Sequence, residues 1–151
     1  MDAAIFKKIV DMAIANEIEA WEFYQAASEK IKEPHLKEMF QGFAREEKGH
    51  ELLLRNLLSR GTMSLNFKET TDYKVAETVD EPRLSLDMKP ADAIALAMKK
   101  EERAMKEYNW LAEQCEDAAQ KKMFLDLAAM ERGHKLQLEE MFVDIGYPEV
   151  W

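Results

Sequence analysis

The chain has 151 residues, of which 47% are hydrophobic and 34% charged, a composition typical of one helix-rich globular domain. This excludes a disordered chain, which could not bury enough apolar surface. The net charge of −9 repels phosphate backbones, so we expect no nucleic-acid partner. Cys115 is the single cysteine, which excludes an intrachain disulfide and a CxxC metal site and favours a reducing, cytoplasmic setting.

The first half of the sequence predicts two helices, over about residues 2–31 and 34–60, separated by a break at Glu33-Pro34. The apolar stripe of the first is Ile5, Ile9, Ala13, Glu17, Ala20, Tyr24, Ala27 and Ile31. The stripe of the second is Leu36, Phe40, Phe43, Glu47, His50, Leu54 and Leu57. The N-terminal segment carries acidic residues inside its apolar pattern, so it predicts neither a signal peptide nor a membrane span.

The second half begins with residues 61–89, which hold no sustained helical period and are predicted to be a linker. A third helix is expected from Pro90 to about residue 115, with Asp87 as its cap, and a fourth from about residue 117 to 145. The stripe of the third is Ile94, Ala97, Glu101, Ala104, Tyr108, Leu111 and Cys115. The stripe of the fourth is Phe124, Leu127, Glu131, His134, Leu138, Met141 and Ile145.

The two halves are related by a shift along the chain. AREEKGH ends at His50 and AAMERGH ends at His134, an offset of 84 positions (134 − 50). Within these motifs the shift aligns Glu47 with Glu131, and outside them it aligns, among other pairs, Glu17 with Glu101 and Tyr24 with Tyr108. The pattern predicts a duplicated helical hairpin.

Every predicted helix carries a glutamate in the middle of its apolar stripe, and in two helices a histidine follows three positions later. A lone buried carboxylate is costly, so these residues need a common explanation. Glu17 and Glu47 lie at equal distances from the Glu33-Pro34 break, so an antiparallel hairpin places them level with each other. Two packed hairpins would gather six side chains at one point: Glu17, Glu47, His50, Glu101, Glu131 and His134.

Four carboxylates and two imidazoles would be neutralised by two divalent cations. Carboxylate and imidazole ligands suit iron or manganese and do not exclude zinc. One Glu from each of two helices and Glu-x-x-His from the other two is the pattern of four-helix di-metal proteins. The sequence therefore predicts a di-metal site.

At these residues the sequence resembles the ferritin-like di-iron superfamily, and the rubrerythrin group most closely. The matching motifs cover both hairpins: Glu17-x-x-Ala20-x-x-x-Tyr24, Glu47-x-x-His50, Glu101-x-x-Ala104-x-x-x-Tyr108 and Glu131-x-x-His134. The resemblance implies an all-α fold, an antiparallel four-helix bundle forming a single domain over residues 1–151. Hairpin 1 (about 2–60) and hairpin 2 (about 90–145) would be joined by a long crossover over 61–89.

The resemblance also implies roles for the site residues. Glu47 and Glu131 would bridge the two metals, Glu17 and Glu101 would be terminal ligands, and each histidine would bind one metal. The implied cofactor is two iron ions, with manganese, a mixed iron–manganese pair and zinc as alternatives. Tyr24 and Tyr108 are expected either to hydrogen-bond metal carboxylates or to fill the core. Other residues are expected to be structural or surface residues: His35, Trp21, Trp110 and Cys115.

Two departures from the rubrerythrin pattern affect the expected activity. Ala104 stands where rubrerythrins carry an extra glutamate, so the ligand set is closer to the symmetric site of bacterioferritins. The chain has no rubredoxin-like CxxC pairs, so electrons are expected from a separate donor such as a rubredoxin-like protein. The expected activity is reduction of hydrogen peroxide or dioxygen. The alternatives are ferroxidase iron handling and a non-catalytic, metal-stabilised bundle. The family expectation is a homodimer, with exchange of hairpins between chains as an alternative.

Overall fold

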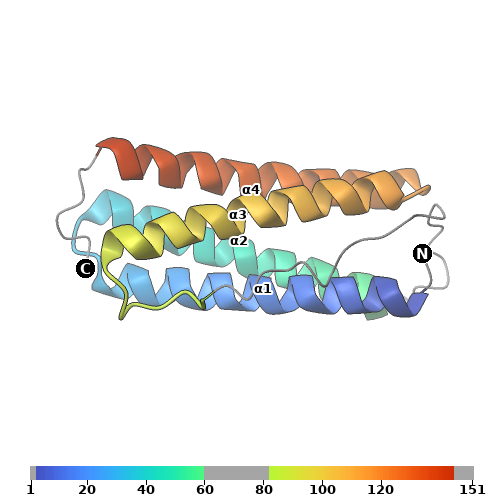
Figure 1. The fold of residues 1–151 in the computed structure, drawn as a ribbon, viewed down its shortest axis with the longest axis horizontal. Coiled ribbons are helices and arrows are strands. Elements are labelled where there is room, and N and C mark those ends of the chain that lie inside the picture. Colours follow the sequence, from blue (N-terminus) through green and yellow to red (C-terminus); the bar gives the residue numbers. More distant parts are fainter. Residues whose placement is uncertain (1–2, 60–81, 145–151) are drawn as a thin grey trace.

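The computed structural model describes residues 3–59 and 82–144, which form four helices (Figure 1). These are α1 (Ala3–Lys30), α2 (Pro34–Ser59), α3 (Pro90–Gln114) and α4 (Ala118–Asp144). The predicted all-α, four-helix fold is confirmed, and each helix end lies within one residue of its expected position. Residues 61–81 of the expected crossover, and Ile145, lie outside the described residues.

The helix starts differ in how their first backbone N–H groups are satisfied. The carboxylate of Glu33 accepts the backbone N–H of Leu36 at 2.7 Å and so caps α2. Asp117 accepts the N–H of Gln120 at 2.9 Å and caps α4. The expected cap Asp87 is wrong, because the N-cap of α3 is Lys89, which makes no side-chain cap hydrogen bond. Pro90 opens this helix without an N–H, which removes one of the donors that a cap would satisfy.

The course of the helices places two hairpins side by side (Figure 1). α1 and α2 run antiparallel, as do α3 and α4, and the closest backbone packing is within each of these pairs. α2 and α3 run in the same direction, so the end of α2 and the start of α3 lie at opposite ends of the bundle. The 26 residues of α2 span about 39 Å at 1.5 Å per residue, which explains why so long a connection is needed.

The apolar core consists of two clusters, one toward each end of the bundle. One is built around Tyr24, Phe40 and Leu138. The other is built around Ile9, Tyr108, Phe124 and further buried side chains. The polar centre described below lies between them.

One expected core position is wrong. Ile5 is 47% exposed, whereas its neighbour Phe6 is fully buried. Ile5 precedes Glu17 by three steps of four residues. Because a helical turn has only 3.6 residues, these steps place Ile5 about 120° around the helix from Glu17 and away from the buried face. Phe6 lies only about 20° from Glu17 around the helix, so it faces the core instead.

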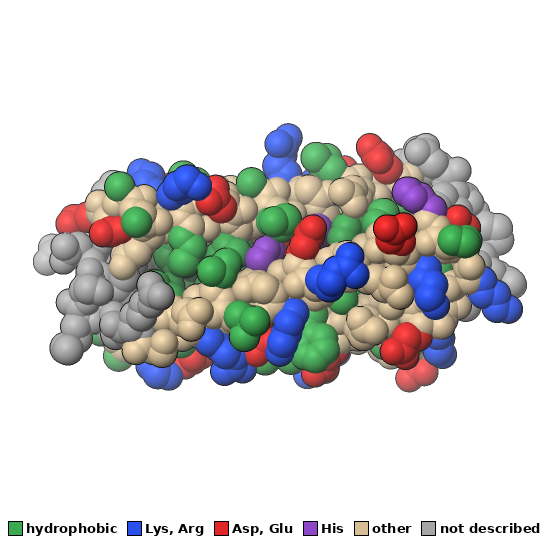
Figure 2. Space-filling model, turned by 180° about the vertical axis from the view of Figure 1, so that it is seen from behind, with side chains coloured by type: hydrophobic (Ala, Val, Ile, Leu, Met, Phe, Trp, Pro, Cys, Tyr) green, Lys and Arg blue, Asp and Glu red, His purple; other side chains and the backbone are tan. Residues whose placement is uncertain are grey.

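The outer surface mixes basic, acidic and apolar side chains, as Figure 2 shows for the face turned away in Figure 1. In the described ranges 3–59 and 82–144, no helix is both long enough and apolar enough to cross a membrane.

Candidate metal centre

The structure brings all six predicted side chains together in the middle of the bundle. α1 contributes Glu17, α2 contributes Glu47 and His50, α3 contributes Glu101, and α4 contributes Glu131 and His134. None of the six is more than 4% exposed. Residues three apart share one face of a helix, so each Glu-x-x-His presents both side chains to the facing hairpin.

The contacts between the hairpins follow the internal duplication. Nδ1 of His50 lies 2.7 Å from Oε1 of Glu131, and Nδ1 of His134 lies 2.7 Å from Oε1 of Glu47. Each contact becomes the other under the 84-residue shift, so the centre has an approximate two-fold axis. Both histidines turn the same ring nitrogen toward the carboxylates, as equivalent metal ligands would.

The two tyrosines also cross from one hairpin to the other. The hydroxyl of Tyr24 donates to Oε1 of Glu101 at 2.7 Å, and that of Tyr108 donates to Oε1 of Glu17 at 2.5 Å. Burial, then the charge of the partner carboxylate, raises the pKa of each tyrosine well above its ordinary value. Both hydroxyls therefore stay protonated and act as donors that fix one oxygen of each lone glutamate.

The ligand atoms form two overlapping groups that could each hold a metal ion. One group is Glu17, Glu47, His50 and Glu131, and the other is Glu47, Glu101, Glu131 and His134. Within each group, one ligand atom from every residue lies within 4.8 Å of the others. Glu47 and Glu131 belong to both groups, which is the position required of carboxylates shared by two ions.

The unpaired atoms of the centre fit this ligand set. Buried atoms without a hydrogen-bond partner include Glu17 Oε2, Glu47 Oε1, Glu101 Oε2 and His134 Nδ1. Nδ1 of His134 lies 2.7 Å from Oε1 of Glu47, but the two groups are not aligned for a hydrogen bond. Buried polar atoms normally find partners, because leaving them unpaired costs about 1–3 kcal/mol each. Cations between these oxygen and nitrogen atoms would supply the missing partners.

Comparisons with known proteins agree with this geometry. A family model described as rubrerythrin matches residues 8–142. The chain belongs to the rubrerythrin family. A hypothetical protein from Pyrococcus furiosus has a similar solved structure, with a TM-score of 0.72, 35% identity, and coverage of 93% of this chain and 91% of that one.

A second solved structure shares the fold at lower identity. It is a candidate ferritin-like diiron-carboxylate protein from Thermotoga maritima, with a TM-score of 0.68 and 21% identity. The match covers 91% of this chain and 93% of that one. A comparison with curated proteins found no significant match.

The carboxylates of this rubrerythrin-family centre strongly influence one another. Burial, and then the charge of Glu101, raises the pKa of both Glu47 and Glu131 well above the ordinary value. Burial would also raise the pKa of Glu17, but its close contacts with Glu47 and His50 lower it. Without cations the shared pair therefore favours its protonated form, and metal binding has to displace protons.

His134 acts as a counter-ion within this cluster. Burial alone would lower its pKa, but contacts with Glu101, Glu46 and Glu47 raise it to about 12. Its Nε2 atom touches the carboxylate of Glu46 at the surface of α2, on the side away from the centre. The sequence analysis missed Glu46, and the one available signal was the pair of adjacent glutamates in REEKGH.

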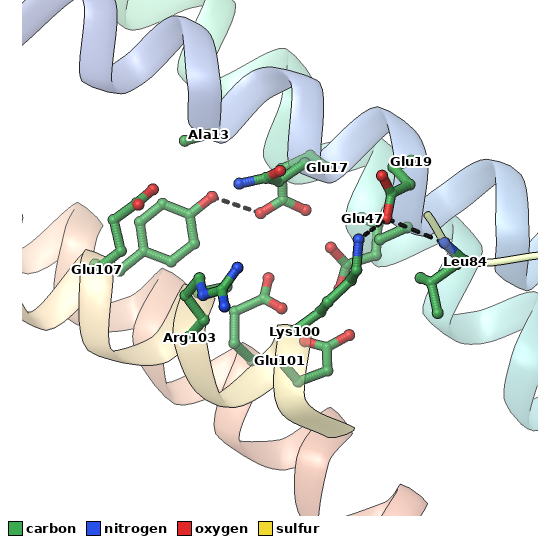
Figure 3. Close-up of a pocket in the computed structure, with 14 residues that line it drawn as sticks. Ala13, Glu17, Glu19, Glu47, Leu84, Lys100, Glu101, Arg103 and Glu107 are labelled. Carbon is green, nitrogen blue, oxygen red and sulfur yellow. Dashed lines mark hydrogen bonds and ion pairs between the residues drawn. The ribbon is translucent and has the colours of Figure 1, made fainter. Parts of the chain in front are cut away.

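A cavity of about 50 Å³ lies beside the carboxylates, between α1 and α3 (Figure 3). Its lining includes all four glutamates of the centre and neither histidine. Ala13, Ala20 and Ala104 contribute small apolar wall positions. Ala104 is the position at which rubrerythrins carry their extra glutamate, so alanine here leaves open a space that a longer side chain would occupy.

The lining of the cavity contains an ion pair that the sequence analysis also missed. The ammonium of Lys100 on α3 reaches across to Oε1 of Glu19 on α1 (Figure 3). The same oxygen accepts the backbone N–H of Leu84 at 3.5 Å, which attaches the segment before α3 to this edge. Arg103 and Glu107 also line the cavity.

The remaining candidate residues lie away from the centre. His35 is exposed at the start of α2. The indole N–H of Trp21 donates to Glu51 at 3.2 Å, and Lys48 lies 4.8 Å above its ring. Trp110 packs partly buried against the cluster that contains Cys115. Burial raises the pKa of that thiol to about 11, so it is unreactive near neutral pH.

Proposed function

We propose that this protein is a di-iron oxidoreductase that reduces hydrogen peroxide, with dioxygen as the alternative oxidant. The observation that carries the proposal is the cavity between α1 and α3, which reaches all four carboxylates while both histidines lie outside its lining. A small molecule entering there would meet the side of the centre that the histidines leave open. Its volume of about 50 Å³ leaves room for a small molecule such as hydrogen peroxide, since a cavity of about 10–15 Å³ can hold one water molecule.

The donor set matches the proposed cofactor. Glu17 and His50 would serve one iron, Glu101 and His134 the other, and Glu47 and Glu131 both. Two iron ions bound there would supply the two electrons that, with two protons, convert hydrogen peroxide to two water molecules. Manganese in one or both positions remains compatible with the ligands, whereas zinc would give binding without redox chemistry.

The side chains around the cofactor have separate tasks in this proposal. Tyr24 and Tyr108 hold the two lone glutamates in place through their hydroxyls. Apolar alanine walls limit the size of the entering molecule and leave little room for bulk water. Electrons would come from a separate rubredoxin-like donor.

The charged side chains around the metal centre do not favour one substrate over the other. Lys100 and Arg103 line the cavity together with the acidic Glu107 and with Glu19, which pairs with Lys100. These charges balance one another, so they distinguish little between Fe²⁺ and neutral hydrogen peroxide. The ferroxidase and the non-catalytic, metal-stabilised bundle are the alternatives that the experiment below separates.

The test begins with elemental analysis of protein purified without oxygen, followed by titration of the reduced form with hydrogen peroxide. We expect about two iron ions per chain and rapid oxidation of both. Glu47→Ala should abolish binding and oxidation together, because it removes a ligand shared by the two ions. Two bound metals with no response to peroxide or dioxygen would contradict the proposal and favour a structural role.

A further inference from the structure

The duplication fails at one position next to the centre. The 84-residue shift aligns Glu46 with Met130. Nε2 of His134 touches the carboxylate of Glu46, whereas methionine offers no carboxylate at the matching place on α4. Both positions are at the surface, with 44% of the Glu46 side chain and 41% of Met130 exposed.

Of the two histidines of the centre, His134 is the one whose Nε2 atom has a carboxylate partner. The ion pairs of His50 with Glu17, Glu47 and Glu131 all run through Nδ1. His134 has the equivalents of two of these pairs through Nδ1, with Glu47 and Glu101, and the additional one with Glu46 through Nε2. The two histidines are therefore alike on the side that faces the centre and unlike on the outer side.

A carboxylate on the outer nitrogen changes how a histidine binds metal. The ring donates its Nε2–H to the carboxylate, which fixes the tautomer that leaves the Nδ1 lone pair for the metal. The same hydrogen bond orients the ring and makes Nδ1 a stronger donor. Glu46 comes from α2 and His134 from α4, so the contact also fixes α4 relative to the facing hairpin.

We propose that Glu46 is a positioning residue that makes the two metal positions inequivalent, so that the position of His134 and Glu101 binds iron more tightly and fills first. This inference rests on the proposed di-metal function. Half-loaded protein then carries its single ion at a defined position rather than at either one at random.

The experiment is an anaerobic titration of the metal-free protein with Fe²⁺, in which calorimetry measures the heat of each binding step. The wild-type chain should bind two ions in two resolved steps. Glu46→Met, which copies the residue of the other half, should weaken the tighter step about 10- to 100-fold, the usual cost of losing such a partner. Glu46→Gln should have an intermediate effect, because an amide oxygen still accepts the hydrogen bond without the charge. Met130→Glu should strengthen the weaker step.

Two controls separate this effect from simpler ones. Glu38→Met removes the same charge from another exposed position of α2 and should leave both steps unchanged. His50→Ala should retain the tighter step, whereas His134→Ala should lose it. Circular dichroism checks that each variant keeps its helical content.

The outcomes distinguish failure of this inference from failure of the proposed function. Two ions bound with equal affinity, or a tighter step that Glu46→Met leaves unchanged or that survives His134→Ala, would overturn the inference while the di-metal site stands. A wild-type chain that binds no iron would overturn both.

Discussion

The two sides of the metal centre are built for different tasks. Toward α2 and α4 lie both histidines, one of them backed by Glu46, in a tightly connected network. Toward α1 and α3 lies the cavity, whose lining includes alanines and the Lys100–Glu19 ion pair. One side holds metal and the other admits a small molecule. The bridging glutamates belong to both sides, and changes on either side should therefore have separable effects.

The largest effect is expected at Glu47 and Glu131, the two glutamates that belong to both sides of the centre. Glu47→Gln and Glu131→Gln should each remove both ions, because each replaces a ligand common to the two groups. The metal-free variants should be at least as stable to heat as metal-free wild type, since each loses a buried acid whose neighbours oppose its charge. Elemental analysis and thermal unfolding measure the two effects. A variant that still binds two irons would show that the shared carboxylates do not bridge.

Filling the cavity should affect the open side alone. Ala104→Leu places a larger side chain in the wall of the cavity, and the metal content should persist. Entry of peroxide would then have to displace packed atoms, which costs about 1–3 kcal/mol. Oxidation by peroxide should therefore slow about tenfold or more. Stopped-flow absorbance of the reduced protein gives the rate. The matched control is Ala129→Leu at an exposed position of α4, which should oxidise at the wild-type rate. Equal rates for both variants would place the entry route elsewhere.

The tyrosines test the approximate two-fold symmetry of the holding network. Tyr24→Phe and Tyr108→Phe each remove one hydrogen bond to a buried carboxylate, which should lower the free energy of unfolding by about 1.5–3 kcal/mol. The two losses should be similar, because the bonds are related by the 84-residue shift. Urea unfolding of metal-free protein measures them. A loss at only one tyrosine would show that the hairpins contribute unequally.

The smallest effect is expected at Lys100 in the lining of the cavity. Lys100→Met removes one positive charge, whose repulsion of a divalent ion about 7 Å away in water is worth about 1.2 kcal/mol, so Fe²⁺ should enter about sevenfold faster at low salt. Stopped-flow binding of Fe²⁺ measures the change. The neighbouring Lys99→Met, at an exposed position, should have no effect. A rate that Lys100→Met leaves unchanged would show that Lys100 does not control the entry of Fe²⁺.

The helices and the six converging side chains could be predicted because their signals are local. Proline and capping residues set the helix ends, and equal spacing from the hairpin turn places Glu17 level with Glu47. The duplication supplies the same information twice. Where the periodicity drifts, as at Ile5, the same local reasoning fails.

The side-chain contacts between the two hairpins could not be predicted from the sequence, because they depend on how the hairpins face each other. The contact of Glu46 with His134 and the pairing of Lys100 with Glu19 each join residues from different hairpins. No spacing within one helix fixes the rotation and separation of the other hairpin. The tyrosine spacing indicated proximity to the glutamates, but not that each hydroxyl binds the lone glutamate of the opposite hairpin.

The most direct test of the central claim is the number of iron ions oxidised per molecule of hydrogen peroxide, measured by Mössbauer spectroscopy of reduced protein mixed with limiting peroxide. Reduction of peroxide to water at a paired centre takes two electrons, so the account predicts two irons oxidised for each peroxide consumed. One iron oxidised per peroxide, with release of a radical, or no oxidation of a fully loaded centre, would contradict it.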